Sequence, residues 1–249
     1  MKTAIITGAS SGLGREFARQ LTDIFPEIEC CWLIARREDR LEELDAYRCM
    51  KNDDFLDQGH VFRKWVVVGH WPVTLYHRRV PTARPLVSER QHIISIDGGC
   101  VLKLDGQLNA LIIPDITGDR VDYVAYDGLR VVRALDRQEA SKDSLNIRWS
   151  DSAVEVLRTE GDCSWCRHLS TGRELWIMNE YLYPRRTDGH IHCEDTTDYA
   201  LPVEPGERLA LVRRCSRGYM VKKHGATGWY FGRVEENIEP LNGSAGSAT

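Results

Sequence analysis

The stretch RLEELDAYRCMKNDDF, residues 40–55, separates two kinds of sequence pattern. Before it, a short β-rich run, a glycine-containing turn and a helical apolar pattern follow one another closely. After it, short apolar runs alternate with turns rich in Gly, Pro and Asp, which is typical of β-strands. We therefore expect two different folding patterns in this chain, which meet near residue 45.

The composition is ordinary for a soluble globular protein and names no function. The 249 residues can bury a substantial core, as one large domain or as two smaller ones. A net charge of -4 gives no general reason to expect a nucleic acid or an anionic membrane as partner. No apolar run approaches the roughly 18 residues of a membrane span, and the N-terminus lacks a signal-peptide pattern. These features predict a cytoplasmic protein.

The N-terminal residues have the pattern of a strand, a glycine turn and a helix. The run KTAIITG (2–8) predicts a strand, SSGLGREFARQLTDIF (10–25) has apolar residues at helical spacing, and CCWLIAR (30–36) predicts a second, parallel strand. Glycines in the turn allow backbone N–H groups and the helix N-terminus to approach a pyrophosphate. The candidate nucleotide-binding residues are Gly8, Ser10, Ser11, Gly12, Leu13 and Gly14.

The turn T-G-A-S-S-G-L-G resembles that of the short-chain dehydrogenase/reductase family, in a Rossmann-type βαβ unit over residues 1–44. The resemblance implies NADP rather than NAD, because Arg36 ends the second strand where a basic residue meets the 2'-phosphate. Arg37 is a second candidate for that contact. The family's Asn-Asn-Ala-Gly turn, serine and Tyr-x-x-x-Lys pair do not follow in order. A glycine turn without a ligand is the alternative interpretation.

The sequence after residue 46 predicts a strand at 65–68 that ends in Gly69 and His70, and further strands at 93–97 and 108–113. With its I-D-x-G-C segment, this part resembles the C-terminal part of the calcineurin-like metallophosphoesterases, in the serine/threonine phosphatase branch, over about residues 46–115. The resemblance implies that His70 is a ligand of one of two catalytic metals such as Mn, Fe or Zn. The family's earlier metal-binding motifs are absent, so no catalytic residue is predicted. The alternative is a solvent-facing histidine at a strand end.

The remaining sequence predicts more strands and few metal sites. Residues 46–160 are expected to form the phosphoesterase fragment, and residues 173–236 resemble a small SH3-like β-barrel. Trp229 and Tyr230 fit either an aromatic peptide-binding strip or core packing. A zinc site at Cys163 and Cys166 is disfavoured, because no second C-x-x-C pair exists to complete four ligands. The small, polar residues 241–249 are expected to be a disordered tail.

These patterns together predict an α+β fold, with one Rossmann-type βαβ unit followed by a mostly β region and a small SH3-like β-barrel. We interpret the chain as a chimera of two truncated families. The favoured function is an incomplete metallophosphoesterase (phosphatase-like hydrolase) fragment without full catalytic activity. The alternatives are an NADP-dependent short-chain oxidoreductase, and a non-enzymatic interaction protein that binds a peptide at the SH3-like barrel.

Overall fold

The computed structural model of the chain describes residues 2–7, 28–34, 53–115, 118, 120–184, 188–236 and 244–247. The chain divides into two compact units, Met1–Asn52 and Asp53–Thr249. Within the described ranges, the secondary structure consists of β-strands and three 3-10 helices, which are η2 (Phe55–Gln58), η3 (Val73–Tyr76) and η4 (Asn179–Tyr181). A search of these same ranges finds no helix with the length and apolar character of a membrane span.

The first unit contains two paired strands. Strand β1 (Lys2–Thr7) runs parallel to β2 (Ile28–Ile34), with Thr7 opposite Ile34. No other strand of the described residues joins this sheet. The predicted α+β fold with a Rossmann-type βαβ unit is therefore wrong, because the described residues form strands and short 3-10 helices, and no further strand among them extends the parallel pair. The predicted helix over residues 10–25 lies outside the described residues.

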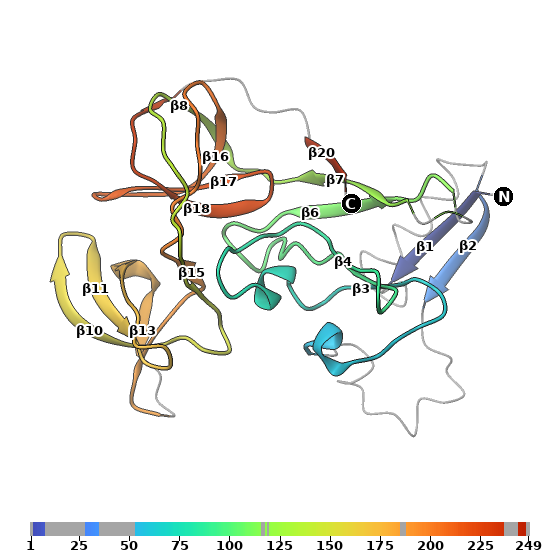
Figure 1. Cartoon of the computed structure of the whole chain (residues 1–249), viewed down its shortest axis with the longest axis horizontal. Coiled ribbons are helices and arrows are strands. Elements are labelled where there is room, and N and C mark those ends of the chain that lie inside the picture. The colour runs from blue at the N-terminus through green and yellow to red at the C-terminus, as the bar shows by residue number, and fades with distance from the viewer. Residues whose placement is uncertain are drawn as a thin grey trace. The chain divides into compact units, whose positions relative to one another are not determined.

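The second unit contains two small sheets, of which strands β3, β4, β6, β7 and β20 are labelled in Figure 1. In the first sheet, the central strand β5 pairs in parallel with β3 and antiparallel with β4. In the second, β7 lies between β6 and β20, and both pairings are antiparallel. The strands are β3 (Val66–Val68), β4 (Leu86–Ser88), β5 (Ile93–Ser95), β6 (Leu108–Ile112), β7 (Asp122–Tyr126) and β20 (Ser244–Ser247).

The glycine-rich loop between β5 and β6 folds back on itself. A Cβ atom on Gly98 would lie 2.3 Å from the backbone oxygen of Gln107, and one on Gly106 would lie 2.2 Å from the backbone oxygen of Gly99. Real Cβ atoms do not approach a backbone oxygen so closely, so both positions require glycine. Gly99 also has a φ of +72°, in the left-handed region that favours glycine. The I-D-G-G-C sequence thus defines a tight loop.

Two five-stranded antiparallel sheets form most of the rest of the second unit, and Figure 1 labels β10, β11 and β13 of one and β8, β16, β17 and β18 of the other. In both sheets the strand order differs from the chain order. One sheet has the order β12-β11-β10-β14-β13, and the other has the order β18-β17-β16-β8-β19. The short strands β9 (Asn146–Ile147) and β15 (Thr196–Thr197) pair with each other as a separate antiparallel sheet. The other strands are β8 (Arg130–Ala134), β10 (Ala153–Glu160), β11 (Cys163–His168), β12 (Glu174–Met178), β13 (Leu182–Pro184), β14 (Ile191–Cys193), β16 (Arg208–Cys215), β17 (Gly218–Lys223), β18 (Ala226–Tyr230) and β19 (Val234–Glu235).

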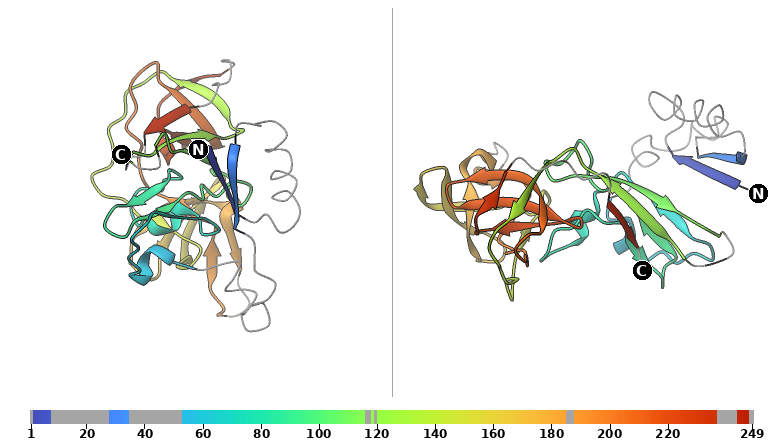
Figure 2. Two further views of the ribbon diagram at one scale, coloured as in Figure 1. Left: turned by 90° about the vertical axis from the view of Figure 1, so that its right-hand side faces the viewer. Right: turned by 90° about the horizontal axis from the view of Figure 1, so that it is seen from above.

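Strand β18 contributes to two hydrophobic cores, because successive side chains of a strand point to opposite faces. Trp229 packs in one core with residues of β11 and β12, such as Cys163 and Leu175. Tyr230 packs in the other core, with residues such as Val132 of β8. The two five-stranded sheets consequently lie side by side, and the two further views in Figure 2 show the same neighbourhood.

A buried lysine connects the second five-stranded sheet to the loops that precede it. The Lys222 side chain on β17 is 3% exposed, and its Nζ atom lies 2.6 Å from Oδ2 of Asp127. The same ammonium group donates to the backbone oxygens of Asp105 (3.1 Å) and Gly106 (3.2 Å). A buried charge is tolerated only when it is paired and hydrogen-bonded, so this lysine fixes both loops against the sheet.

The predicted segment boundaries cut across these sheets. Strand β8, at residues 130–134, lies between β16 and β19, although residues 173–236 were expected to form a barrel of their own. Strands β10 and β11 likewise pair with β12 and β14 of that segment. Residues 244–247, in the expected tail, form β20 against β7. Residues from both sides of the predicted boundaries at 160–173 and at 236–241 therefore share the same sheets, whereas no sheet of the described residues crosses the boundary at 44–46.

Candidate functional site

The candidate nucleotide-binding residues are in the predicted turn after β1 and in the segment after β2. Gly8, Ser10, Ser11, Gly12, Leu13, Gly14, Arg36 and Arg37 lie outside the described residues. The described neighbours are the two parallel strands β1 and β2 that flank the glycine turn and end before Arg36. NADP binding by this turn stays a prediction.

His70 lies two residues after the end of β3, in the left-handed conformation, with a φ of 66° and an exposed side chain. The parallel pairing of β3 and β5 brings Asp97 close, since a Cβ atom on Gly69 would lie 4.0 Å from the Asp97 Cβ. However, Oδ1 of Asp97 accepts the Gly99 N–H at 2.8 Å and so stabilises its own turn. Among the described His, Cys, Asp and Glu residues, no group of three that could hold a metal includes His70.

The two cysteines of the C-x-x-C sequence lie in the same core but have different cysteine neighbours. Burial raises the pKa of Cys166 to about 11, and Cys193 lies near it in the same core. Burial, followed by a hydrogen bond with Cys215, raises the pKa of Cys163 to about 12. The ligand atoms of Asp162, Cys163 and Cys215 all lie within 4.8 Å of one another. The structure therefore completes a cluster around Cys163 with a cysteine that is distant in sequence.

A cavity of about 690 Å³ lies between the two five-stranded sheets. Four aromatic side chains line it, from β11 (Trp165), from β12 (Trp176), and from the end of β18 and the residue after it (Trp229 and Phe231). Its other lining residues are Glu160, Gly161, Glu174, Leu175, Asp198, Ser216 and Arg217. This size is within the usual range of small-ligand and peptide pockets. The cavity is the strongest candidate binding site among the described residues.

The aromatic rings are held in defined positions. Trp229 is 4% exposed, donates from Nε1 to the Thr197 oxygen at 2.7 Å, and stacks on Phe231 with a centroid distance of 5.9 Å. The rings of Trp165 and Trp176 are tilted at 55°, with centroids 5.3 Å apart. Because several contacts fix these rings, the walls of the cavity are preorganised for a ligand.

Cationic side chains cover part of the aromatic wall. The guanidinium carbon of Arg217 lies 3.7 Å from the centroid of the Trp176 ring, and that of Arg158 lies 5.3 Å from it. Arg158 and Arg217 also pair with Glu160, at 3.0 and 3.7 Å. These cation–π contacts stiffen the wall on the β12 side.

The other acidic groups of the cavity are paired as well. Glu174 accepts hydrogen bonds from Arg167 (2.8 Å) and from Nε1 of Trp165 (3.0 Å), and these bonds lower the pKa of its carboxyl. Asp198 accepts from Nε of Arg173 at 2.5 Å. Each charged group of the cavity therefore has a partner within the protein, and Phe231, which is 58% exposed, is the most accessible of the four rings.

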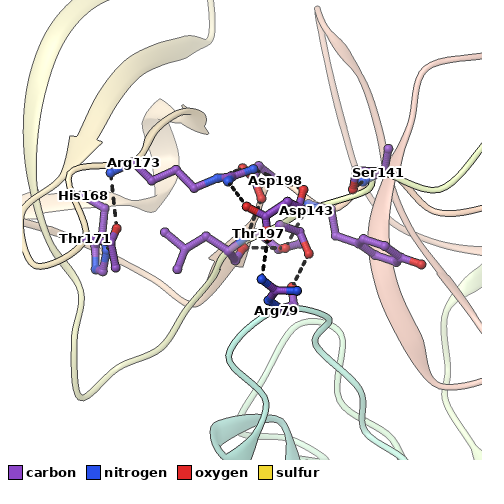
Figure 3. Close-up of polar contacts among 12 residues, drawn as sticks. Arg79, Ser141, Asp143, His168, Thr171, Arg173, Thr197 and Asp198 are labelled. Atoms are coloured by element: carbon purple, nitrogen blue, oxygen red, sulfur yellow. Dashed lines mark hydrogen bonds and ion pairs between the residues drawn. The ribbon is translucent and has the colours of Figure 1, made fainter.

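Arg173 also connects the cavity to the preceding loops (Figure 3). Besides Asp198, its guanidinium contacts Asp143 at 2.9 Å, and Asp143 pairs with Arg79 at 3.1 Å. The two arginines and the two aspartates of this network come from four segments of the chain that are far apart in sequence. This network supports the side of the cavity that carries Asp198.

A buried histidine of β14, His192, has both ring nitrogens occupied by hydrogen-bond partners. Nε2 of His192 lies 2.9 Å from Oδ2 of Asp188, and Nδ1 lies 3.0 Å from Oγ of Ser152. A Ser-His-Asp series of this kind is used in nucleophilic catalysis when the serine is accessible. Ser152 is only 3% exposed, and the described cavity is lined by other residues. This series therefore satisfies buried polar groups.

Comparison with known proteins adds no relative for this site. No family model, no curated protein and no solved structure matches the chain. The aromatic cavity and the Asp162–Cys163–Cys215 cluster were not predicted from the sequence. Both combine residues from two separate sheets, and no spacing along the chain indicates them.

Proposed function

We propose that the protein is a non-catalytic binding protein that takes a proline-rich peptide in the aromatic cavity between its two five-stranded sheets. The observation that carries this proposal is the composition of the cavity wall, with four aromatic rings and charged groups that are already paired. The proposal agrees with the third function expected from the sequence, a peptide-binding interaction protein.

The chemistry of the wall favours an uncharged, rigid ligand. A charged peptide would have to displace internal ion pairs, such as Arg173–Asp198, to find a partner. Proline rings instead pack on aromatic faces without needing a charged partner. A proline-rich segment is also preformed as a polyproline II helix, so it loses little conformational entropy when it binds an aromatic groove.

The test measures the anisotropy of a fluorescently labelled proline-rich peptide titrated with the full chain. We expect Phe231→Ala to weaken binding at least about tenfold, because truncation of an aromatic residue in a binding site commonly costs more than 1.4 kcal/mol. Trp149→Ala is the matched control, since Trp149 and Phe231 are each 58% exposed and Trp149 does not line the cavity. Circular dichroism confirms that both variants are folded.

Two results would contradict the proposal. The first is equal affinity of the Phe231→Ala and Trp149→Ala variants for the peptide. The second is that the intact chain does not bind the proline-rich peptide, even at protein concentrations far above the Kd values typical of peptide recognition. An alanine-substituted peptide that binds as tightly as the proline-rich one would reject the proline class of ligand.

A phosphatase-related function is the second candidate, favoured by the position of His70. The exposed imidazole lies two residues after the end of β3. Asp97, which lies two residues after the end of the parallel strand β5, is close to the neighbouring Gly69. This function predicts metal-dependent turnover of p-nitrophenyl phosphate that exceeds the rate of a His70→Ala variant. Equal rates for the two proteins would remove this candidate without affecting the peptide-binding proposal.

A further inference from the structure

Two hairpin turns from different sheets meet beside the aromatic cavity. The β10–β11 turn contains Gly161 and Asp162 and is followed by Cys163, the first residue of β11. The β16–β17 turn contains Ser216 and Arg217 and is preceded by Cys215, the last residue of β16. Each turn therefore carries one cysteine at its junction with a strand.

Direct hydrogen bonds hold these turns together. The Asp162 carboxylate accepts the backbone N–H of Ser216 at 2.9 Å and the hydroxyl of Ser216 at 2.5 Å. These bonds hold the pKa of the Asp162 carboxyl below its usual value. The two hydrogen bonds thus fix the carboxylate next to the two thiols.

The cluster has the donor set and the dimensions of a zinc site. The carboxylate oxygen and the two sulfur atoms all lie within 4.8 Å of one another. In a tetrahedral site with Zn–S distances of about 2.3 Å, two sulfur ligands lie about 3.8 Å apart. The two sulfur atoms would have to approach by at most about 1 Å, which side-chain rotation can supply. Two thiolates select a soft or borderline ion such as Zn²⁺ over Mg²⁺ or Ca²⁺.

We infer that Asp162, Cys163 and Cys215 form a zinc-binding site that links the two five-stranded sheets. On binding, each thiol transfers its proton to solvent, both sulfur atoms and one carboxylate oxygen coordinate the ion, and a fourth position is left for water or another ligand. The site is distinct from the peptide-binding surface, and it does not depend on the proposed function.

Neighbouring donors orient these ligands in the way that metal sites require. The backbone N–H of Arg217 donates to Sγ of Cys215 at 3.4 Å, within the range for a sulfur acceptor. The Ser216 donors orient the Asp162 carboxylate. Hydrogen bonds of this kind fix the orientation of ligands, and their loss typically weakens metal binding about 10–100-fold.

The position of the cluster gives the ion a structural role. Gly161 and Ser216, which are next to the ligands in sequence, both line the aromatic cavity. A metal bound between the turns would hold the two sheets at a fixed separation at this edge of the cavity. Zinc should therefore raise the melting temperature of the protein as well as bind to it.

The test uses Co²⁺ as a spectroscopic substitute for Zn²⁺ in the full chain, reduced and freed of metal with a chelator. We expect a thiolate-to-cobalt charge-transfer band at one ion per chain, which is removed when Zn²⁺ displaces the cobalt. Cys215→Ser and Asp162→Asn should weaken binding at least about a hundredfold, and Ser216→Ala about tenfold. Cys100→Ser is the control, since Cys100 is exposed and outside the cluster.

The outcomes are decisive in both directions. A cobalt band that is lost in Cys215→Ser and retained in Cys100→Ser supports the site. A band that persists unchanged in Cys215→Ser, or no band in the reduced chain, overturns it. If Cys215→Ser does not fold, Asp162→Asn decides, because Asp162 is exposed and its substitution leaves both cores intact. Unchanged cobalt affinity in that variant would overturn the inference.

Discussion

The buried ion pair of Lys222 and Asp127 provides a quantitative test of how the second five-stranded sheet is attached to the preceding loops. Lys222→Met keeps most of the apolar side chain but removes the ammonium group, which lies 2.6 Å from the Asp127 carboxylate. It also removes the donor to the backbone oxygens of Asp105 and Gly106. Asp127 would then remain as a largely buried charge without this partner.

The expected cost follows from the burial of the two partners. Breaking a buried ion pair from one side costs about 3–5 kcal/mol. The Lys222 side chain is 3% exposed but that of Asp127 is 20% exposed, so water can solvate part of the remaining carboxylate. We therefore expect the lower end, about 3 kcal/mol, which corresponds to a decrease of about 6–12 °C in Tm for a unit of this size.

Thermal unfolding followed by circular dichroism measures this decrease. The matched control is Lys142→Met, because Lys142 is exposed and its substitution should change stability by no more than about 0.5 kcal/mol. The double variant Lys222→Met/Asp127→Asn should recover part of the loss, since it removes the isolated charge. If Lys222→Met and Lys142→Met unfold at the same temperature, the lysine does not stabilise this junction and our reasoning is wrong.

Three further predictions concern single positions of the second unit. Tyr230→Phe removes the hydroxyl that donates to the Asp136 oxygen (2.8 Å) and accepts its N–H (2.9 Å), so the free energy of unfolding should fall by about 1–2 kcal/mol in urea titrations. Gly98→Ala should destabilise by about 1–3 kcal/mol, because its Cβ would meet a backbone oxygen at 2.3 Å, whereas Gly128→Ala, with nothing within 4 Å, should be neutral or slightly stabilising by the same assay. Hydrogen bonds from Arg233 lower the pKa of Asp136 to about 2. The stability that this pair contributes is therefore present above a pH of about 4 and is lost as the pH falls through about 2. A ¹³C NMR titration should show this pKa and its return toward 3.8 in Arg233→Gln, and an unchanged pKa in that variant would contradict the assignment.

Local sequence pattern was sufficient to place several strands. The predicted strands at 93–97 and 108–113 lie close to β5 (Ile93–Ser95) and β6 (Leu108–Ile112), because β-branched runs between Gly and Pro turns have a strong local signal. The α+β class was wrong because a strand, glycine turn and helical pattern at one end was extended to a whole fold. A pattern within one segment does not determine how many strands extend its sheet.

The candidate sites depend on contacts that no local pattern encodes. Trp176 and Trp229 lie in segments with an ordinary strand pattern of residues. Their convergence on one cavity depends on how the two sheets pack against each other. The C-x-x-C spacing associates Cys163 with Cys166, but the thiol that lies beside Cys163 together with Asp162 is that of Cys215. Such long-range pairings are fixed by sheet topology, which a single sequence does not specify.

The place of β8 in its sheet has a consequence for the order in which the chain assembles during synthesis. This strand leaves the ribosome early, but its neighbours β16 and β19 follow only after the whole β10–β14 sheet has been made. Until then its backbone edges are unpaired, and such edges invite association with other chains. Release of the nascent chain before residue 235 should therefore produce aggregation, even when the sheet of strands β10–β14 has already formed.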